Sequence, residues 1–313
     1  MDSYEISANA KINIFLRICG KLPNGYHKLY MVMQEIDISD DVTVNLDSER
    51  PAGIDVVCSD LMGLDPTKNL CYKAADRFYA RLHKKLVSEG TREKIVFPHT
   101  EIILRKGIPN QAGMGGGSSD AAAVLLALQE HFGEPLNEEE LNETAVNIGA
   151  DVPFFLYGGT GLCEGVGEVV TQLDAFPKWP LLIVKPRQGV STARSYSEVD
   201  KLDLPPLDKS RYEELFRELL ETDGDLDRAD EVLDRNRELL INDLQAPGID
   251  EVPVIRDIIS SLEKEGASLA LMTGSGSAVF GLFKTTEDAE KVRKALASDA
   301  RFSDCDFFVT GMI

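Results

Sequence analysis

The sequence predicts a two-domain protein in which strands and helices are mixed along the whole chain. Its 313 residues correspond to about two domains of ordinary size. Runs with the two-residue alternation of strands lie between runs with the three-to-four-residue spacing of helices, and no repeat or low-complexity tract interrupts them. Hydrophobic residues make up 43% of the chain and charged residues 27%, which is typical of a soluble globular protein and excludes a disordered one.

Elements of the first part of the chain are predicted by residue spacing. Residues 12–18 form a strand in which every second residue is Ile or Leu, and residues 42–46 and 54–57 are further strands. Residues 70–87 carry the apolar spacing of an amphipathic helix. A strand at residues 101–104 then leads into a run of glycines.

That run, residues 109–117, is the first glycine loop, and an alanine-rich helix through Leu128 follows it. Glycine lets the backbone approach a ligand closely, while a helix N-terminus offers unsatisfied N–H groups and a positive dipole end. The loop therefore predicts a polyphosphate site, although it matches neither a Walker loop nor a dinucleotide fingerprint. A flexible turn is the alternative for glycines alone, and a predicted helix cap at Ser118 and Ser119 argues against it.

Later segments continue the mixed pattern. An Asn137 cap predicts a helix towards Ile148 that ends at Gly149, just before Asp151. Further predictions are a strand at 181–184, acidic helices with a solvated face in 208–240, strands at 269–272 and 278–280, and a capped amphipathic helix from Thr286. Residues 273–277, between the last two strands, form the second glycine loop.

Charge and cysteine content exclude several classes of function. The chain has 33 basic and 53 acidic residues, and its formal net charge of −20 disfavours general binding to nucleic acid or anionic membranes. Its five cysteines contain no Cys-x-x-Cys pair, which indicates neither a disulfide framework nor a zinc site. There is no basic leader and no apolar run of membrane-spanning length, so we expect a cytoplasmic protein.

Five separated segments together resemble the motifs of the GHMP small-molecule kinases. The resemblance covers nearly the whole chain and implies a two-domain α+β fold, with a ribosomal protein S5 domain 2-like domain at 1–158 and a GHMP C-terminal domain at 159–313. The segments are Ala10-Lys11-Ile12-Asn13, Gly25-Tyr26-His27, residues 109–123, residues 149–155 and residues 272–277.

The resemblance also assigns catalytic and nucleotide-binding roles. Phosphoryl transfer to an alcohol needs a base for the hydroxyl and a cation for the phosphoryl charge, and the family motifs place these roles on Asp151 and Lys11. Each residue alone would more often be a turn aspartate or a solvated lysine, so only the joint match supports the assignment. ATP is expected with Mg²⁺, for which Ser119 is a possible ligand. The expected ATP-binding residues are Asn69, Lys106, Pro109, Gly113, Gly115, Gly116, Gly117, Ser118 and Ser119.

Substrate recognition is expected around Gly25-Tyr26-His27, which narrows the resemblance to members whose alcohol is carried on cytidine diphosphate. Tyr26 offers a ring for base stacking and His27 a donor and an acceptor, although packing is the alternative for the pair alone. The resemblance adds Asn13, Tyr196, Gly274 and Ser275 to the substrate-binding residues. The chain departs from the family pattern at residues 21–24, which lack the usual arginine and aspartate.

Three functions stay open at this stage. The first is the kinase of a cytidine diphosphate-linked small molecule, and the second is a GHMP kinase for another alcohol, such as homoserine or mevalonate. The third is a non-catalytic nucleotide sensor, against which the presence of both Lys11 and Asp151 argues. We expect a monomer or a weak homodimer with a small-molecule substrate and no nucleic-acid or membrane partner.

Overall fold

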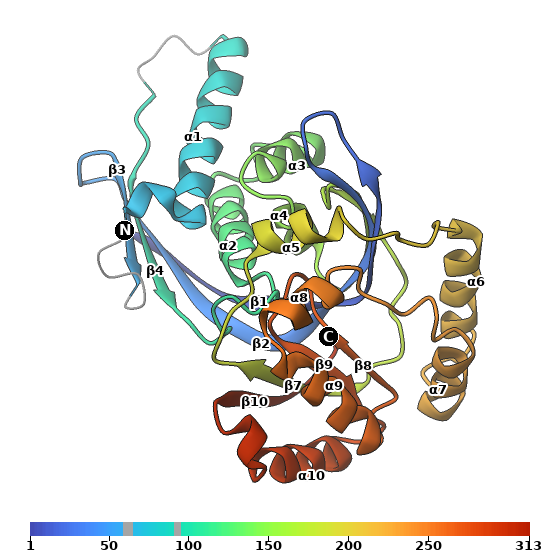
Figure 1. The fold of residues 1–313 in the computed structure, drawn as a ribbon. Helices are drawn as coiled ribbons and strands as arrows, with labels where there is room; N and C mark the ends of the chain where they lie inside the picture. The colour runs from blue at the N-terminus through green and yellow to red at the C-terminus, as the bar shows by residue number, and fades with distance from the viewer. Residues whose placement is uncertain (59–64, 91–94) are drawn as a thin grey trace. The chain divides into compact units, whose positions relative to one another are not determined.

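The computed structural model describes residues 1–58, 65–90 and 95–313, and the chain divides into two compact units (Figure 1). The first unit comprises Met1–Ala10, Ile38–Ile108 and Gly115–Tyr157. The second unit comprises Lys11–Asp37, Pro109–Met114 and Gly158–Ile313. Strands β1 (Asp2–Lys21) and β2 (His27–Asp47) pair with each other, and each contributes residues to both units. The domain limits 1–158 and 159–313 stay a prediction.

The described residues of the first unit combine part of the sheet with four helices. The end of β2 pairs antiparallel with β4 (His99–Arg105), which pairs parallel with β3 (Gly53–Cys58). The helices are α1 (Leu70–Ser88), α2 (Gly116–His131), α3 (Glu138–Val146) and α4 (Val152–Tyr157), and a short 3-10 turn, Pro66–Lys68, precedes α1. The predicted apolar face of α1 is buried through Ala74, Phe78 and Leu82, as the helical spacing requires.

Helix α2 lies side by side with α1 and also packs against α4 (Figure 1). Three successive alanines, Ala121–Ala123, are buried along with Leu125 and Leu128, whereas Leu126 is exposed. Small side chains permit close approach, so the alanine run is a packing feature of the buried part of the helix. This placement fixes the start of α2, where the first glycine loop ends.

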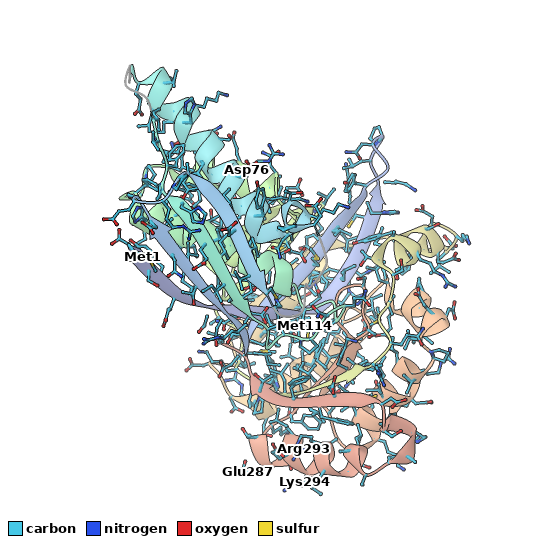
Figure 2. The ribbon with its side chains drawn as sticks, turned by 90° about the vertical axis from the view of Figure 1, so that its left-hand side faces the viewer. Met1, Asp76, Met114, Glu287, Arg293 and Lys294 are labelled. Carbon is cyan, nitrogen blue, oxygen red and sulfur yellow. The ribbon has the colours of Figure 1, made fainter. Side chains whose placement is uncertain are left out.

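The second unit contains an antiparallel sheet in the order β10 (Cys305–Gly311), β7 (Pro180–Pro186), β9 (Val279–Leu282) and β8 (Leu269–Met272). Helix α9 (Val254–Lys264) packs on β8 and β9, and α10 (Thr286–Ala297) packs on β7 and β10. The predicted capped helix is confirmed in α10, where Thr285 is the cap and Glu287 and Lys294 are exposed (Figure 2). This unit also contains β5 (Thr160–Gly165), β6 (Val169–Gln172), α5 (Thr192–Val199), α6 (Lys209–Leu220), α7 (Leu226–Arg235), α8 (Gln245–Glu251) and a short 3-10 turn, Ala300–Phe302.

The acidic segment 208–240 forms α6 and α7, which confirms its predicted helical character. Its inner face is tied to β1 through Arg17, whose guanidinium donates to the Tyr212 hydroxyl (2.9 Å) and to Asp243 (3.2 Å). Tyr212 also packs on Phe15, with ring centroids 4.5 Å apart. The segment is therefore an anchored part of the second unit with a solvated outer face.

The C-terminal boundary of α3 differs from the sequence prediction. Helix α3 has the expected Asn137 capping box but ends at Val146, with Asn147 as its C-cap, and does not continue to Ile148. None of the helices within residues 1–58, 65–90 and 95–313 has the length and apolarity that a membrane span needs.

Candidate active site

Lys11 is a buried lysine on β1 in the second unit, with only 3% of its surface exposed. Its Nζ donates to Asn13 Oδ1 (2.5 Å) and to the Gly113 carbonyl oxygen (2.8 Å). Its backbone N–H donates to the Met114 carbonyl (3.0 Å). A buried ammonium group is costly unless oxygen acceptors surround it, so these contacts hold Lys11 against the first glycine loop.

Asn13 extends this cluster to the second glycine loop. Its backbone N–H donates to Thr273 Oγ1 (3.0 Å), and its amide Nδ2 contacts Met31 Sδ (3.3 Å). Thr273 was not among the predicted site residues, although its position directly before Gly274 in the motif could have indicated it. The structure thus brings together Lys11, Asn13, Gly113 and Thr273.

Gly274 and Ser275 lie in the same second glycine loop. Gly274 has φ +54, and a Cβ there would stand 2.7 Å from the Gly113 carbonyl oxygen, so a side chain would collide with the first loop. The Gly274 carbonyl accepts from Asn242 Nδ2 (2.8 Å). The Ser275 hydroxyl lies 2.7 Å from Thr192 Oγ1 at the start of α5. Both predicted substrate residues therefore occupy a loop fixed by neutral hydrogen bonds.

The predicted base-binding residues lie at the turn between β1 and β2. Tyr26 is 63% exposed, whereas His27 is only 8% exposed. The Tyr26 backbone N–H donates to Asn24 Oδ1 (3.1 Å), so an asparagine stabilises this turn where the family pattern has aspartate. The turn leaves one aromatic ring in solvent beside a buried imidazole.

Helix α5 fixes the His27 ring. Asp200, the C-cap residue of α5, has its Oδ1 2.6 Å from His27 Nε2. The Tyr196 ring of the same helix stacks on the imidazole, with centroids 4.9 Å apart and planes 22° apart. Lys21 and then His27 lower the pKa of Asp200 by hydrogen bonding to its carboxylate. Sequence analysis missed Asp200, because nothing near it in the chain marks it as a partner of His27.

In the first unit, α2 begins differently from the prediction. Gly115 is its N-cap, with φ +76 and no side-chain cap, and the N–H groups of Ser118 and Ser119 both donate to the Gly115 carbonyl (2.9 Å each). The predicted Ser118-Ser119 cap is therefore wrong, because both serines already lie in the first helical turn. A helix start without a side-chain cap keeps its first N–H groups available for an anion.

Lys106 has two acidic partners, Asp40 and Asp120. Its Nζ donates to Asp40 Oδ2 and to Asp120 Oδ2 (2.6 Å), while Asp40 Oδ1 accepts from the N–H groups of Gly107 (2.7 Å) and Ile108 (2.8 Å). This cluster connects the end of β4 to the second turn of α2, where Asp120 lies. Burial, together with the neighbouring Asp40 carboxylate, raises the pKa of Asp120 to about 7, although the Lys106 ammonium group opposes this rise. Neither acid was predicted, although Asp120 directly follows Ser119.

Two more predicted residues adjoin α2 in the first unit. Asn69 caps α1 by accepting from the Cys71 N–H (2.8 Å). Leu70, the residue after Asn69, lies close to α2, since a Cβ on Gly117 would stand 3.7 Å from its Cδ1. Asp151 directly precedes α4, and a Cβ on the nearby Gly149 would lie 3.8 Å from Ser118 Oγ. Asn69 therefore directly precedes a residue that lies beside the start of α2, and Asp151 lies two residues after another such residue.

The predicted residues divide between the units. The first unit holds Asn69, Lys106, Asp151 and the segment from Gly115 to Ser119, and the second holds Lys11, Pro109, Gly113 and all the predicted substrate residues. The pairing of Lys11 with Asp151 stays a prediction. Within the part of the chain that the structure describes, no group of three or more His, Cys, Asp or Glu residues is arranged to hold a metal ion.

Two family models match the chain. The model for the GHMP kinases N terminal domain matches residues 69–159, and the model for the GHMP kinases C terminal matches residues 213–301. The first match contains the first glycine loop and Asp151, and the second contains the second glycine loop.

Curated relatives are similar along nearly the full chain. A 4-diphosphocytidyl-2-C-methyl-D-erythritol kinase of Desulfitobacterium hafniense is 41% identical over 290 residues, covering 92% of this chain and 90% of the relative. A protein of the same name from Geobacter metallireducens is 37% identical over 318 residues, covering 100% and 99%.

Solved structures agree in fold. A crystal structure of 4-(cytidine 5'-diphospho)-2C-methyl-D-erythritol kinase is 28% identical with a TM-score of 0.72, covering 99% of both chains. A homoserine kinase from Cytophaga hutchinsonii has a TM-score of 0.68 at 18% identity, covering 100% of this chain and 95% of the other, and shows the fold alone.

Proposed function

Because the chain belongs to the GHMP kinase family, a family of ATP-dependent small-molecule kinases, we propose that it phosphorylates the 2-hydroxyl of 4-diphosphocytidyl-2-C-methyl-D-erythritol. This step belongs to the non-mevalonate route to isoprenoid precursors. One observation of the structure carries the choice of substrate: exposed Tyr26 adjoins a His27 imidazole held by Asp200 and Tyr196. An aromatic ring beside an oriented imidazole suits a nucleobase, which neither homoserine nor mevalonate contains.

The proposed transfer uses Asp151 as the base and Lys11 as the cation. A base must be oriented towards the acceptor hydroxyl, and a cation must offset the charge on the transferred phosphoryl group. Lys11 suits the second role because Asn13 and Gly113 hold its ammonium group in a fixed position in a buried environment. Asn13 would thereby orient the cation as well as contact the substrate.

The ATP phosphates would bind at the start of α2. Gly115, Gly116 and Gly117 permit close approach, and the helix start without a side-chain cap offers N–H groups together with the Ser118 hydroxyl. Magnesium would arrive bound to ATP and neutralise phosphate charge, and the Ser119 hydroxyl in the first turn is the ligand that this chain would offer. Asn69, Lys106 and Pro109 would border the nucleotide.

The substrate base would stack on Tyr26 and hydrogen-bond to His27. Tyr196 would support this base site by stacking on the His27 ring. Gly274 and Ser275 would contribute from the second glycine loop, in which Thr273 accepts a hydrogen bond from Asn13. We also propose that the enzyme works in the cytoplasm as a monomer or weak homodimer.

Release of ADP by the purified protein tests the substrate. MgATP is supplied with 4-diphosphocytidyl-2-C-methyl-D-erythritol, homoserine, mevalonate or no acceptor. We expect turnover with the cytidyl compound alone. Turnover only with homoserine or mevalonate would replace the proposed substrate, and ATP binding without turnover would favour a nucleotide sensor.

The variant Asp151→Asn tests the catalytic assignment. Loss of a general base lowers turnover by about 100-fold or more, whereas ATP binding should be retained because the phosphates contact α2. Turnover and the dissociation constant for ATP are measured on the same preparation. Near-normal turnover would remove Asp151 from this role.

A further inference from the structure

We propose that Asp40 is a positioning residue for ATP, because its carboxylate joins the two ends of the first glycine loop and thereby fixes the start of α2. The proposal rests on the proposed function, since it assumes that the ATP phosphates bind at that helix start. It also makes the Lys106 ammonium group a counterion of this carboxylate, so that the ammonium group supports ATP binding without touching the nucleotide.

Asp40 holds the end of β4, where the first glycine loop begins. Its side chain is fully buried on β2, and Oδ1 accepts from the N–H groups of both Gly107 (2.7 Å) and Ile108 (2.8 Å). Two successive N–H groups that converge on one oxygen form a concave nest, whereas the residues of an extended strand alternate in direction. The carboxylate therefore turns the chain out of β4 directly before Pro109, the first residue of the loop.

The same carboxylate lies beside the other end of the loop. A Cβ on Gly116, the first residue of α2, would stand 3.3 Å from Asp40 Oδ2 and 3.1 Å from Ile108 Cγ2. The two ends of the loop therefore lie against each other, with one oxygen of Asp40 bonded to the first end and the other beside the second. A site that is held in place before its ligand arrives binds more tightly, because less conformational entropy is lost on binding.

Lys106 offsets the negative charge that this arrangement brings to the start of α2. A carboxylate without a cation would repel an anion bound nearby. The Lys106 ammonium group donates to Asp40 Oδ2 and to Asp120 Oδ2 (2.6 Å), and only 12% of its side-chain surface is exposed. Asp120 Oδ1 is buried and has no hydrogen-bond partner among the described residues. Removal of the ammonium group would therefore leave two buried carboxylates uncompensated beside the phosphate site.

The variant Asp40→Ala tests the positioning role through ATP binding, measured by calorimetry with a non-hydrolysable ATP analogue. We expect the dissociation constant to rise by about 30-fold, because two backbone N–H groups and one ammonium group lose their shared acceptor. At saturating ATP, kcat and the KM for the acceptor should change by less than about threefold, since Asp40 takes no part in the transfer. A purely structural residue would instead lower the melting temperature and leave the dissociation constant of the folded protein unchanged.

The matched control is Asp41→Ala. Asp41 is the next residue of β2 and is exposed, so its side chain points away from the buried carboxylate cluster. This variant should leave the dissociation constant for the ATP analogue, kcat and the KM for the acceptor unchanged.

Lys106→Met and the double variant Lys106→Met/Asp120→Asn test the counterion role. The single variant should weaken binding of the ATP analogue by about tenfold or more, because two carboxylates are left without a cation. The second substitution restores the net charge of the cluster, so the affinity should return to within about threefold of the wild type. If Lys106 contacts ATP directly, the double variant will bind as weakly as the single one, which would overturn the counterion role. Unchanged affinity in Lys106→Met would overturn it as well.

The outcomes separate this inference from the proposed substrate. An unchanged dissociation constant in a folded Asp40→Ala protein would overturn the positioning role. If that variant does not fold, the same result in Asp40→Asn, whose amide turns a donor towards the Lys106 ammonium group, would overturn it instead. Weaker ATP binding in the Asp40 variant, together with no turnover of 4-diphosphocytidyl-2-C-methyl-D-erythritol by the wild type, would support the positioning role and overturn the proposed reaction.

Discussion

The two glycine loops are similar in sequence but differ in how their backbone groups are used. In the second loop, the N–H groups of Gly276 and Ser277 donate to the carbonyls of Thr273 (2.9 Å) and Gln111 (3.2 Å). The end of the first loop instead passes into α2, whose N-cap Gly115 supplies no side-chain cap. Backbone N–H groups of the second loop are thus bonded to carbonyls of that loop and of the first loop, whereas the helix start that follows the first loop has no side-chain cap and is suited to an anion.

The polar groups around the two loops also differ. Asn242, Thr273 and Ser277 form neutral hydrogen bonds within the second loop or to its neighbours. Beside the start of α2, the buried groups are the charged residues Asp40, Lys106 and Asp120. The stability of the second loop should therefore depend mainly on packing. The stability of the region around the start of α2 should also depend on pH, because its charged groups can titrate.

Gly113→Ala should give the largest effect, because it brings the two loops into collision. A Cβ on Gly113 would stand 2.1 Å from the Thr273 carbonyl oxygen, and the residue has φ +74. We expect a loss of at least about 3 kcal/mol of unfolding free energy, measured by denaturant titration. Gly133→Ala is the control, since Gly133 has φ +71 but a Cβ there would meet no atom of the described residues within 4 Å. An equal loss in both variants would show that the backbone angle alone, and not the contact between loops, requires glycine.

Gly117→Ala should separate ligand binding from stability. A Cβ there meets only Leu70 Cδ1, at 3.7 Å, and alanine is a better helix former than glycine by about 1 kcal/mol. The protein should be at least as stable as the wild type, while the KM for ATP rises about tenfold because the added methyl group keeps the phosphates from the backbone. The KM for the acceptor serves as the internal control. An unchanged KM for ATP would contradict the assignment of the α2 start as the phosphate site.

Asp120→Asn should give the smallest effect, which appears in the pH dependence of stability. Folding raises the pKa of this carboxyl from 3.8 to about 7 by burial, so the folded state binds the extra proton between these values. The stability that this extra proton gives to the folded state is fully present below about pH 4 and is lost as the pH rises through about 7. Between pH 5 and 8, the melting temperature of the wild type should therefore fall by about 2–4 °C more than that of the variant. Asp76→Asn, at an exposed position of α1, should behave as the wild type does.

Most helices and strands whose position is decided by residues close together in the sequence were predictable. The spacing of Ala74, Phe78 and Leu82 predicted α1, and Asn137 with Glu140 predicted the start of α3, because the residues that decide these features are neighbours in the chain. The fold of the GHMP kinases was confirmed as well. The predicted cap at Ser118 and Ser119 was wrong because positive φ at Gly115 starts the helix earlier than a serine cap would.

The candidate site was predictable only in part. Lys11, Asn13, Tyr26 and His27 stand in motifs that the sequence displays, but their partners Thr273 and Asp200 are remote in the chain. Asp40, one of the two acidic partners of Lys106, was missed for the same reason, since it lies on another strand.

The sequence by itself determined the family and the reaction type, and it predicted candidate residues for the chemistry, because these depend on residue types at short fixed spacings. Tertiary structure decided how those residues are held: which oxygens surround the Lys11 ammonium, how the helix after the first glycine loop begins, and which carboxylate contacts His27. Hydrogen bonds and burial join residues such as Asn13 and Thr273 that are 260 positions apart. No local pattern specifies such pairs, because their contact exists only after the chain has folded.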